Sequence, residues 1–155
     1  MARITNIMLF EQPEVSTLAV RTRTKVQDLP VLIGKTYGSI AAYLEELGRY
    51  MAGVPFVAYH NMDMQDLDVE MGFPVAGKLA GKGDIRAGTI PAGLVVGCLH
   101  QGAYSGLQGT YEEMAKWIQE HGFKPTGLAY ECYFNGPEHP EALLLTQIMM
   151  PVQRM

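Results

Sequence analysis

Two stretches of the chain, TYGSIAAYLEELG at residues 36–48 and TYEEMAKWIQEHG at residues 110–122, share one pattern. Each opens on a Thr-Tyr pair, has an aromatic residue six positions after the tyrosine and closes on a glycine, at a common offset of 74 residues (111 − 37, 117 − 43 and 122 − 48). Apolar residues recur in both with the period of a packed helix, and glycine is common where helices stop. The stretches therefore predict two equivalent helices, ending at Gly48 and Gly122.

The similarity between the halves extends to both sides of these helices. A β-rich run precedes each one, Leu18-Ala19-Val20 in the first half and Leu94-Val95-Val96 in the second. Two more runs follow each helix, residues 56–62 and 67–75 against residues 127–135 and 143–152, and the last run of each pair ends in Pro-Val. Each half therefore predicts strand, helix, strand, strand.

This pattern predicts an α+β fold made of duplicated strand-helix-strand-strand units. One unit alone has too little helix to cover both faces of its sheet, so we expect two units with antiparallel sheets, related by a pseudo-two-fold axis, with a cleft between the halves. The first repeat spans about residues 13–75 and the second about 89–153. Residues 76–88, with four glycines and two lysines, are expected to form a connecting loop.

Length and composition limit the class of protein. A chain of 155 residues with 48% apolar residues suits a single domain over residues 1–155. With 12 basic and 16 acidic residues and no dense Lys/Arg cluster, direct nucleic-acid binding is not expected. No segment suits a signal peptide or a membrane span, which predicts a cytoplasmic protein without membrane contact.

Cys98 and Cys132 are expected to be reduced, buried thiols. No metal-ligand or nucleotide-binding motif is present, so no cofactor is expected.

Three stretches of the sequence resemble the GyrI-like family, the small-molecule-binding domain also found as the effector domain of multidrug-sensing transcription regulators. They are DVEMGFPV at residues 68–75, the run from HQGAY at residues 100–104 through Tyr111 to Trp117, and YECYFNGP at residues 130–137. Gly136 and Gln147 depart from the family pattern, in which acidic residues are common at both positions. Because the two repeats fill the chain, a helix-turn-helix domain is not expected, and neither is a one-chain transcription regulator.

The leading candidate site residue is Glu131. Alternation along its strand puts it on one face with Ala129, Tyr133 and Asn135, and a solvated face is the alternative to a cleft. The resemblance implies that this acid lies in the ligand cleft. Partial desolvation raises the pKa of a carboxylate unless a partner compensates, so Glu131 would serve as counter-charge to a cationic ligand or as a general base.

Further candidates for ligand contact come from both halves. His60 is matched to Glu131 at an offset of 71, and Glu70 is a possible second carboxylate; a half-exposed strand surface is the alternative for both. Tyr43 and Trp117 are expected at the edges of their helices, lining a groove, with core packing as the alternative. Tyr104 and Tyr133 complete the aromatic candidates. Several of the ten methionines, among them Met62, could give adaptable walls, although core packing is their ordinary role.

These features predict a binding protein for hydrophobic, planar or cationic small molecules. The resemblance implies an alternative, because stand-alone family members include hydrolases that open cyclopropane rings of DNA-alkylating natural products. In that reaction Glu131 and Tyr133 would be catalytic, with Tyr104 and Trp117 excluding other nucleophiles. A third hypothesis is an inhibitor or protector of DNA gyrase, the activity that named the family; no feature identifies a protein partner.

Overall fold

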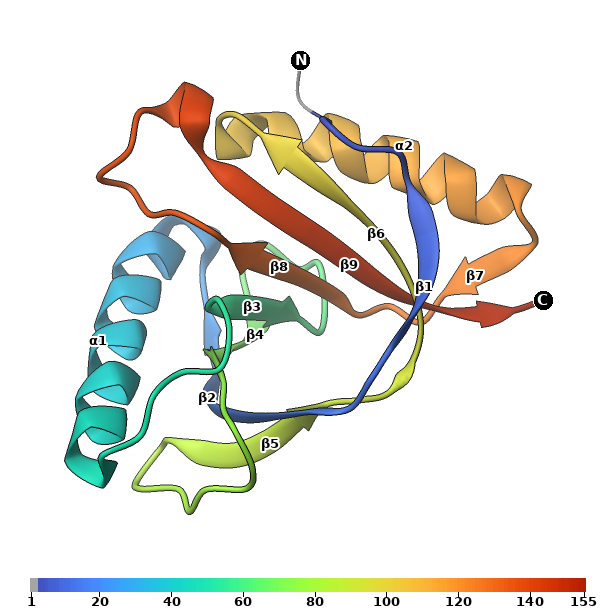
Figure 1. Cartoon of the computed structure of the whole chain (residues 1–155). Helices are drawn as coiled ribbons and strands as arrows, with labels where there is room; N and C mark the ends of the chain where they lie inside the picture. Colours follow the sequence, from blue (N-terminus) through green and yellow to red (C-terminus); the bar gives the residue numbers. More distant parts are fainter. Residues whose placement is uncertain (1–2) are drawn as a thin grey trace. The chain divides into compact units, whose positions relative to one another are not determined.

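The computed structural model describes residues 3–155, which form an α+β fold with nine strands and two α-helices (Figure 1). The chain divides into two compact units. We call Pro13–Ala92 the N-unit, and residues 3–12 together with Gly93–Met155 the C-unit. Strand pairs inside each unit are antiparallel, as predicted. The pseudo-two-fold axis, the single-domain assignment and the cleft between the halves stay predictions.

The N-unit is a four-stranded sheet with α1 packed on one face. The strands lie in the order β3-β4-β2-β5. Leu18, Phe73 and Val75 of the sheet side form a buried cluster with Ile40 and Leu44 of the helix. The elements are β2 (Val15–Thr24), α1 (Leu29–Leu47), β3 (Phe56–Tyr59), β4 (Leu67–Pro74) and β5 (Arg86–Ile90), with a 3-10 turn at Val26–Asp28 before the helix.

The C-unit has strands in the order β8-β9-β6-β1, and β7 pairs separately with β9. Its helix α2 packs on β6 and β9, where Val96, Cys98 and Ile148 form a buried cluster with Met114 and Ile118 of the helix. The elements are β1 (Met8–Gln12), β6 (Gly93–Gln101), α2 (Leu107–Glu120), β7 (Phe123–Pro125), β8 (Ala129–Tyr133) and β9 (Leu145–Arg154), with 3-10 turns at Tyr104–Gly106 and Glu141–Leu143.

The two predicted helix ends are confirmed. Gly48 follows the last residue of α1 with φ of 67°, and its N–H and that of Arg49 donate to carbonyls of the last turn. Gly122 stands two residues beyond α2 with φ of 79°. This left-handed conformation costs glycine nothing and other residues more, which is why the repeated glycine marked both stops.

The strands differ from the prediction at three places. The interval 76–88 is not entirely loop, because β5 begins at Arg86 and pairs with Val15–Ala19 of β2. The strand expected over residues 56–62 ends at Tyr59. The short strands β1 and β7 were not predicted, since five and three residues are too few to show a clear alternation of apolar and polar positions.

On the N-unit face away from α1, Arg21 and Asp68 form a bidentate ion pair, with N–O distances of 3.0 and 2.9 Å. The hydrogen bond from Arg21, followed by its charge, holds the pKa of Asp68 below its ordinary value, although burial opposes this. The Asp68 side chain is 15% exposed, but Arg21 is 56% exposed, so solvent screens much of the interaction.

We expect Asp68→Asn to lower the free energy of unfolding at pH 7 by about 0.5–1 kcal/mol. Because the folded pKa of Asp68 is depressed, its contribution is present above the unfolded value of about 4 and is lost as the pH falls through the folded value. Urea unfolding of both proteins from pH 7 down to pH 2 measures this. A difference that stayed constant to pH 2 would assign the effect to packing instead of charge.

Both cysteines are buried free thiols, as predicted. Burial, followed by the Glu131 charge, raises the pKa of Cys132 to about 12, and burial raises that of Cys98. Within residues 3–155, no three His, Cys, Asp or Glu side chains gather in a metal-ligand arrangement. In the same part of the chain, no helix is both long and apolar enough to cross a bilayer.

Candidate functional site

The main candidate site is built around a buried carboxylate in the C-unit. Glu131 lies in β8 and is only 7% exposed. It pairs across the sheet with Ile148, which belongs to the cluster packed under α2, so the acid projects from the helix-covered face. This burial excludes the solvated strand face that was the alternative for Glu131.

Two tyrosines hold the carboxylate. The Tyr111 hydroxyl donates to Glu131 Oε2 at 2.6 Å, and the Tyr133 hydroxyl donates to Oε1 at 2.7 Å. Hydrogen bonds to an ionised group at these distances are short and strong. No Lys, Arg or His within residues 3–155 forms an ion pair with this acid. The site therefore holds a buried acid that is hydrogen-bonded but has no cationic partner in the described chain.

The local sequence explains this arrangement. Tyr133 stands two residues after Glu131, so strand alternation puts both side chains on the same face. Tyr111 lies on α2 beside the buried positions Met114 and Ile118, at the flank of the helix that reaches β8. In the sequence Tyr111 marks the helix, and it was not among the predicted site residues. The repeated Thr-Tyr pair was the signal that could have indicated its role.

Tyr104 adds an aromatic edge to the same site. It lies in the 3-10 turn before α2, and its ring meets that of Tyr133 edge-on with centroids 5.8 Å apart. Burial, followed by the charges of Glu131 and Glu138, raises the pKa of the Tyr104 phenol. Tyr104 is 44% exposed, so solvent reaches this side of the site. The structure thus brings Tyr104, Tyr133 and Glu131 together.

A buried histidine positions the turn that carries Tyr104. His100, 1% exposed, contacts Thr110 Oγ1 at 2.9 Å through Nδ1 and the carbonyl oxygen of Ala103 at 3.3 Å through Nε2. Since a carbonyl only accepts, Nε2 carries the proton and Nδ1 accepts from the threonine. Thr110, the threonine of the repeated pair, thereby ties the first turn of α2 to β6.

Trp117 lies elsewhere on α2. Six residues separate it from Tyr111, about one and two-thirds turns, which puts the two aromatics on opposite flanks of the buried stripe. Its ring stacks on His121 at 3.8 Å between centroids and packs against the core cluster of the C-unit. This placement favours core packing, the alternative named for Trp117, and its contact with a ligand stays a prediction.

His60 and Glu70 form a separate pair in the N-unit, with Nε2 and Oε1 3.2 Å apart. The match of His60 to Glu131 is wrong in strand register. Val57 lies opposite Met71 as Glu131 lies opposite Ile148, and the shared Pro-Val ends align Met71 with Ile148. Val57, three residues before His60, therefore has the position of Glu131, at the offset of 74 residues that also relates the two helices.

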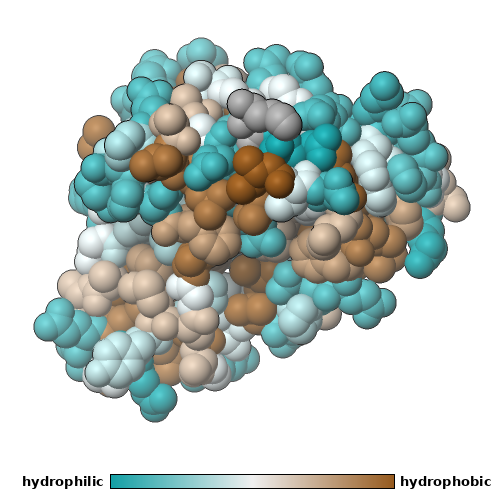
Figure 2. Space-filling model, turned by 45° about the horizontal axis from the view of Figure 1, so that its top comes forward, coloured by the Kyte–Doolittle hydropathy of each residue, from teal (hydrophilic) through white to brown (hydrophobic). Residues whose placement is uncertain are grey.

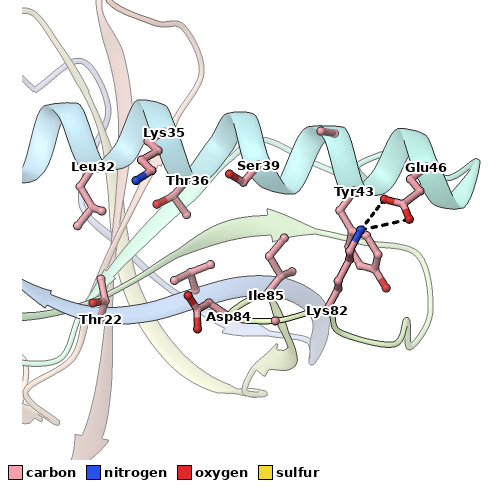
Figure 3. Close-up of a pocket in the computed structure, with 13 residues that line it drawn as sticks. Thr22, Leu32, Lys35, Thr36, Ser39, Tyr43, Glu46, Lys82, Asp84 and Ile85 are labelled. Carbon is pink, nitrogen blue, oxygen red and sulfur yellow. Dashed lines mark hydrogen bonds and ion pairs between the residues drawn. The ribbon is translucent and has the colours of Figure 1, made fainter.

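Tyr43 is 8% exposed and belongs to the buried cluster under α1, where its hydroxyl donates to the Ala80 carbonyl at 2.7 Å. It also lines a groove of about 580 Å³ between α1 and residues 82–85 (Figure 3). An ion pair between Lys82 and Glu46 bridges the two walls, and both side chains are 60% exposed. Solvent screens these charges, so we regard this groove as a weaker candidate than the buried acid.

The methionines fall into a buried group and an exposed group. Met71 and Met114 are fully buried and Met149 nearly so, which is ordinary core packing. Met51, Met62 and Met64 are exposed, and Figure 2 shows apolar surface interspersed with hydrophilic surface on the face that it displays. Adaptable walls made by the exposed methionines stay a prediction.

A few convergent polar groups among aromatic side chains are typical of the sites at which proteins bind small molecules, and Glu131 with its tyrosines is such a group of side chains. The sequence model of the GyrI-like small-molecule-binding domain matches residues 5–153. The chain belongs to this family. A comparison with curated proteins finds no match.

Solved structures share the fold. EcmrR in its complex with DNA has a TM-score of 0.83 at 23% identity; the match covers 97% of this chain and 58% of EcmrR. Its isolated C-terminal domain gives 0.82 at 24% identity, with 97% and 98% covered. A hydrolase from Listeria innocua gives 0.70 at 14% (95% and 91% covered), and SAV2435 bound to tetraphenylphosphonium gives 0.67 at 16% (96% and 94%). At these identities the likeness establishes the fold alone.

Proposed function

We propose that this protein binds lipophilic organic cations, with Glu131 as the counter-charge. The observation that carries the proposal is the buried carboxylate that accepts two phenol hydrogen bonds and has no ion pair in the described chain. Removing a carboxylate from water without a cationic partner is unfavourable by several kcal/mol. Two hydrogen bonds offset part of this, and a bound cation offsets more.

The surrounding side chains select the kind of cation. Tyr111, Tyr133 and Tyr104 present ring surface around the acid, which favours aromatic or otherwise apolar groups. Electron-rich ring faces also attract positive charge, by about 0.5–2 kcal/mol for each well-placed ring. A delocalised cation with aromatic substituents loses little hydration on entering such a site. It therefore fits better than a small, strongly hydrated ion.

Related proteins support this choice of ligand. SAV2435 was solved bound to tetraphenylphosphonium, a cation with four aromatic rings, and it shares this fold. EcmrR, whose C-terminal domain has the same fold, was solved in complex with DNA. For this chain we propose ligand binding without direct contact to nucleic acid or membrane, in the cytoplasm.

Tetraphenylphosphonium is the probe for the proposal. We expect saturable binding by isothermal titration calorimetry with a dissociation constant below about 1 mM, equivalent to about −4 kcal/mol. Tetraphenylborate, which has the same shape and the opposite charge, is the matched control and should bind much more weakly. Equal affinity for both ions would contradict a role for the carboxylate.

The hydrogen bond between Tyr133 and Glu131 Oε1 supports a second candidate, a hydrolase. A carboxylate oxygen has further lone-pair capacity, so Glu131 would accept a proton from water while Tyr133 orients it. The predicted substrates are cyclopropane-bearing alkylators, opened by addition of water. Incubation followed by mass spectrometry should show a gain of one water in the small molecule. If the alkylator binds but its mass stays unchanged over many hours, the protein is a binder only.

A further inference from the structure

A small notch lies in the N-unit where β2 and β5 pair. Gly88 of β5 is opposite Thr17 of β2. A Cβ added at Gly88 would lie 3.3 Å from Thr17 Oγ1 and 3.7 Å from Glu70 Oε2, and no other atom beyond its chain neighbours falls within 4 Å. Two oxygens from two different strands therefore border one methyl-sized space. It lies on the sheet face away from α1, because Thr17 alternates with the core residue Leu18.

The Thr17 hydroxyl points to a ligand at this notch. Thr17 is 2% exposed, and its Oγ1 has no hydrogen-bond partner among the described residues. Leaving a buried hydroxyl unsatisfied costs about 1–3 kcal/mol, and such groups are rare in folded proteins.

The second oxygen is fixed and charged. His60 contacts Glu70 Oε1 at 3.2 Å, which orients the carboxylate so that Oε2 is the oxygen beside Gly88. Arg21, which lies opposite Glu70 in the strand register, is engaged in its bidentate pair with Asp68. No Lys or Arg in the described chain forms an ion pair with Glu70, whose side chain is 25% exposed and so reachable from solvent.

We infer that this notch binds a small protonated primary amine. The ammonium group would donate one hydrogen bond to Thr17 Oγ1 and one to Glu70 Oε2, and charge-assisted bonds of this kind are the strong ones. A carboxylate repels anions, and the methyl-sized space excludes a quaternary ammonium. The ligand class is thus distinct from the lipophilic cations of the Glu131 site, and the inference does not depend on that proposal.

One cation of the chain itself lies in the same strand as Gly88. Arg86 precedes Gly88 by two residues in β5, so its side chain leaves the sheet on the same side. It forms no ion pair among the described residues. The test therefore includes Arg86→Gln, which removes this charge.

The experiment is an NMR titration of the whole chain with ethylammonium chloride, following the Gly88 amide, with tetramethylammonium chloride as the control at matched ionic strength. We expect saturable shifts with ethylammonium and only salt effects with tetramethylammonium. Gly88→Ala fills the notch, and Thr17→Val removes one acceptor while keeping the side-chain shape. Each should weaken ethylammonium binding by about tenfold or more, the effect of losing one charge-assisted hydrogen bond. Arg86→Gln should leave it equal or tighter.

Several outcomes would overturn the inference. If the wild type shows no saturation, the notch holds an ordered water only. Binding that appears only in Arg86→Gln would mean that the chain's own arginine occupies the notch. Displacement of ethylammonium from wild type by tetraphenylphosphonium would put the amine at the Glu131 site. Failure of tetraphenylphosphonium to bind at all would contradict the proposed function, and it would leave the result for ethylammonium binding at the notch unaffected.

Discussion

Glu131→Gln is expected to weaken tetraphenylphosphonium binding by about tenfold or more, since losing one partner of a buried charge pair typically costs about 2–5 kcal/mol. Glutamine keeps the shape of the side chain and an oxygen for one of the two phenols, but it carries no charge. Its NH2 group also meets the hydroxyl of the other tyrosine, which must reorient to accept. Calorimetry gives the affinity, and circular dichroism checks that the variant is folded.

Glu70→Gln is the matched control for this prediction. It is the same substitution in a strand carboxylate, but the Glu70 side chain is 25% exposed and has His60 beside it, whereas Glu131 is 7% exposed as a residue. A partly solvated carboxylate contributes about 0–1 kcal/mol, so the affinity should change by a few-fold at most. Equal effects of the two variants would indicate a site that uses both carboxylates. A larger effect of Glu70→Gln would put the lipophilic-cation site in the N-unit.

The two α-helices and the glycines at their C-terminal ends could be predicted because they depend on local sequence rules. An apolar period of 3.6 and a glycine after the last turn are visible in a single sequence, and the second Thr-Tyr stretch repeats both. The strands β4 and β9 were found for a similar reason, since each is long and has the shared Pro-Val pair at or near its end. Short edge strands such as β5 have few side chains facing a core, so their pairing depends on the tertiary partner β2.

The candidate site could be predicted only in part. Alternation put Glu131 and Tyr133 on one face, but it does not say which face a helix covers. The contact from Tyr111 to Glu131 joins residues 20 positions apart and depends on how α2 lies over β8. The match of His60 to Glu131 failed because it used an offset of 71 residues, whereas the strand register keeps the offset of 74 that relates the two helices. Nothing in the sequence indicates a role for Thr17, since a buried hydroxyl without a hydrogen-bond partner arises only when the sheet is packed.

The second large effect, on the free energy of unfolding, is expected at Ile148, which lies opposite Glu131 in the neighbouring strand. It is fully buried in the C-unit cluster and lies between Cys98 of β6 and Glu131 of β8 in the strand register. Ile148→Ala removes three carbons from a close-packed position and should lower the free energy of unfolding by about 2–5 kcal/mol. Urea unfolding followed by circular dichroism measures the change.

Ile4→Ala is the control, because the same atoms are removed from a side chain that is 49% exposed, where the change should stay within about 0.5 kcal/mol. Ile148→Val, which removes one carbon, should cost about 0.5–1.5 kcal/mol and leave tetraphenylphosphonium binding close to wild type. A cavity between β9 and α2, next to Glu131, loosens the packing beside that side chain, so Ile148→Ala should also weaken binding in protein that is still folded. If Ile148→Ala unfolds as easily as expected but binds the cation as tightly as Ile148→Val, the carboxylate is positioned by its two tyrosines and not by the packing under its strand.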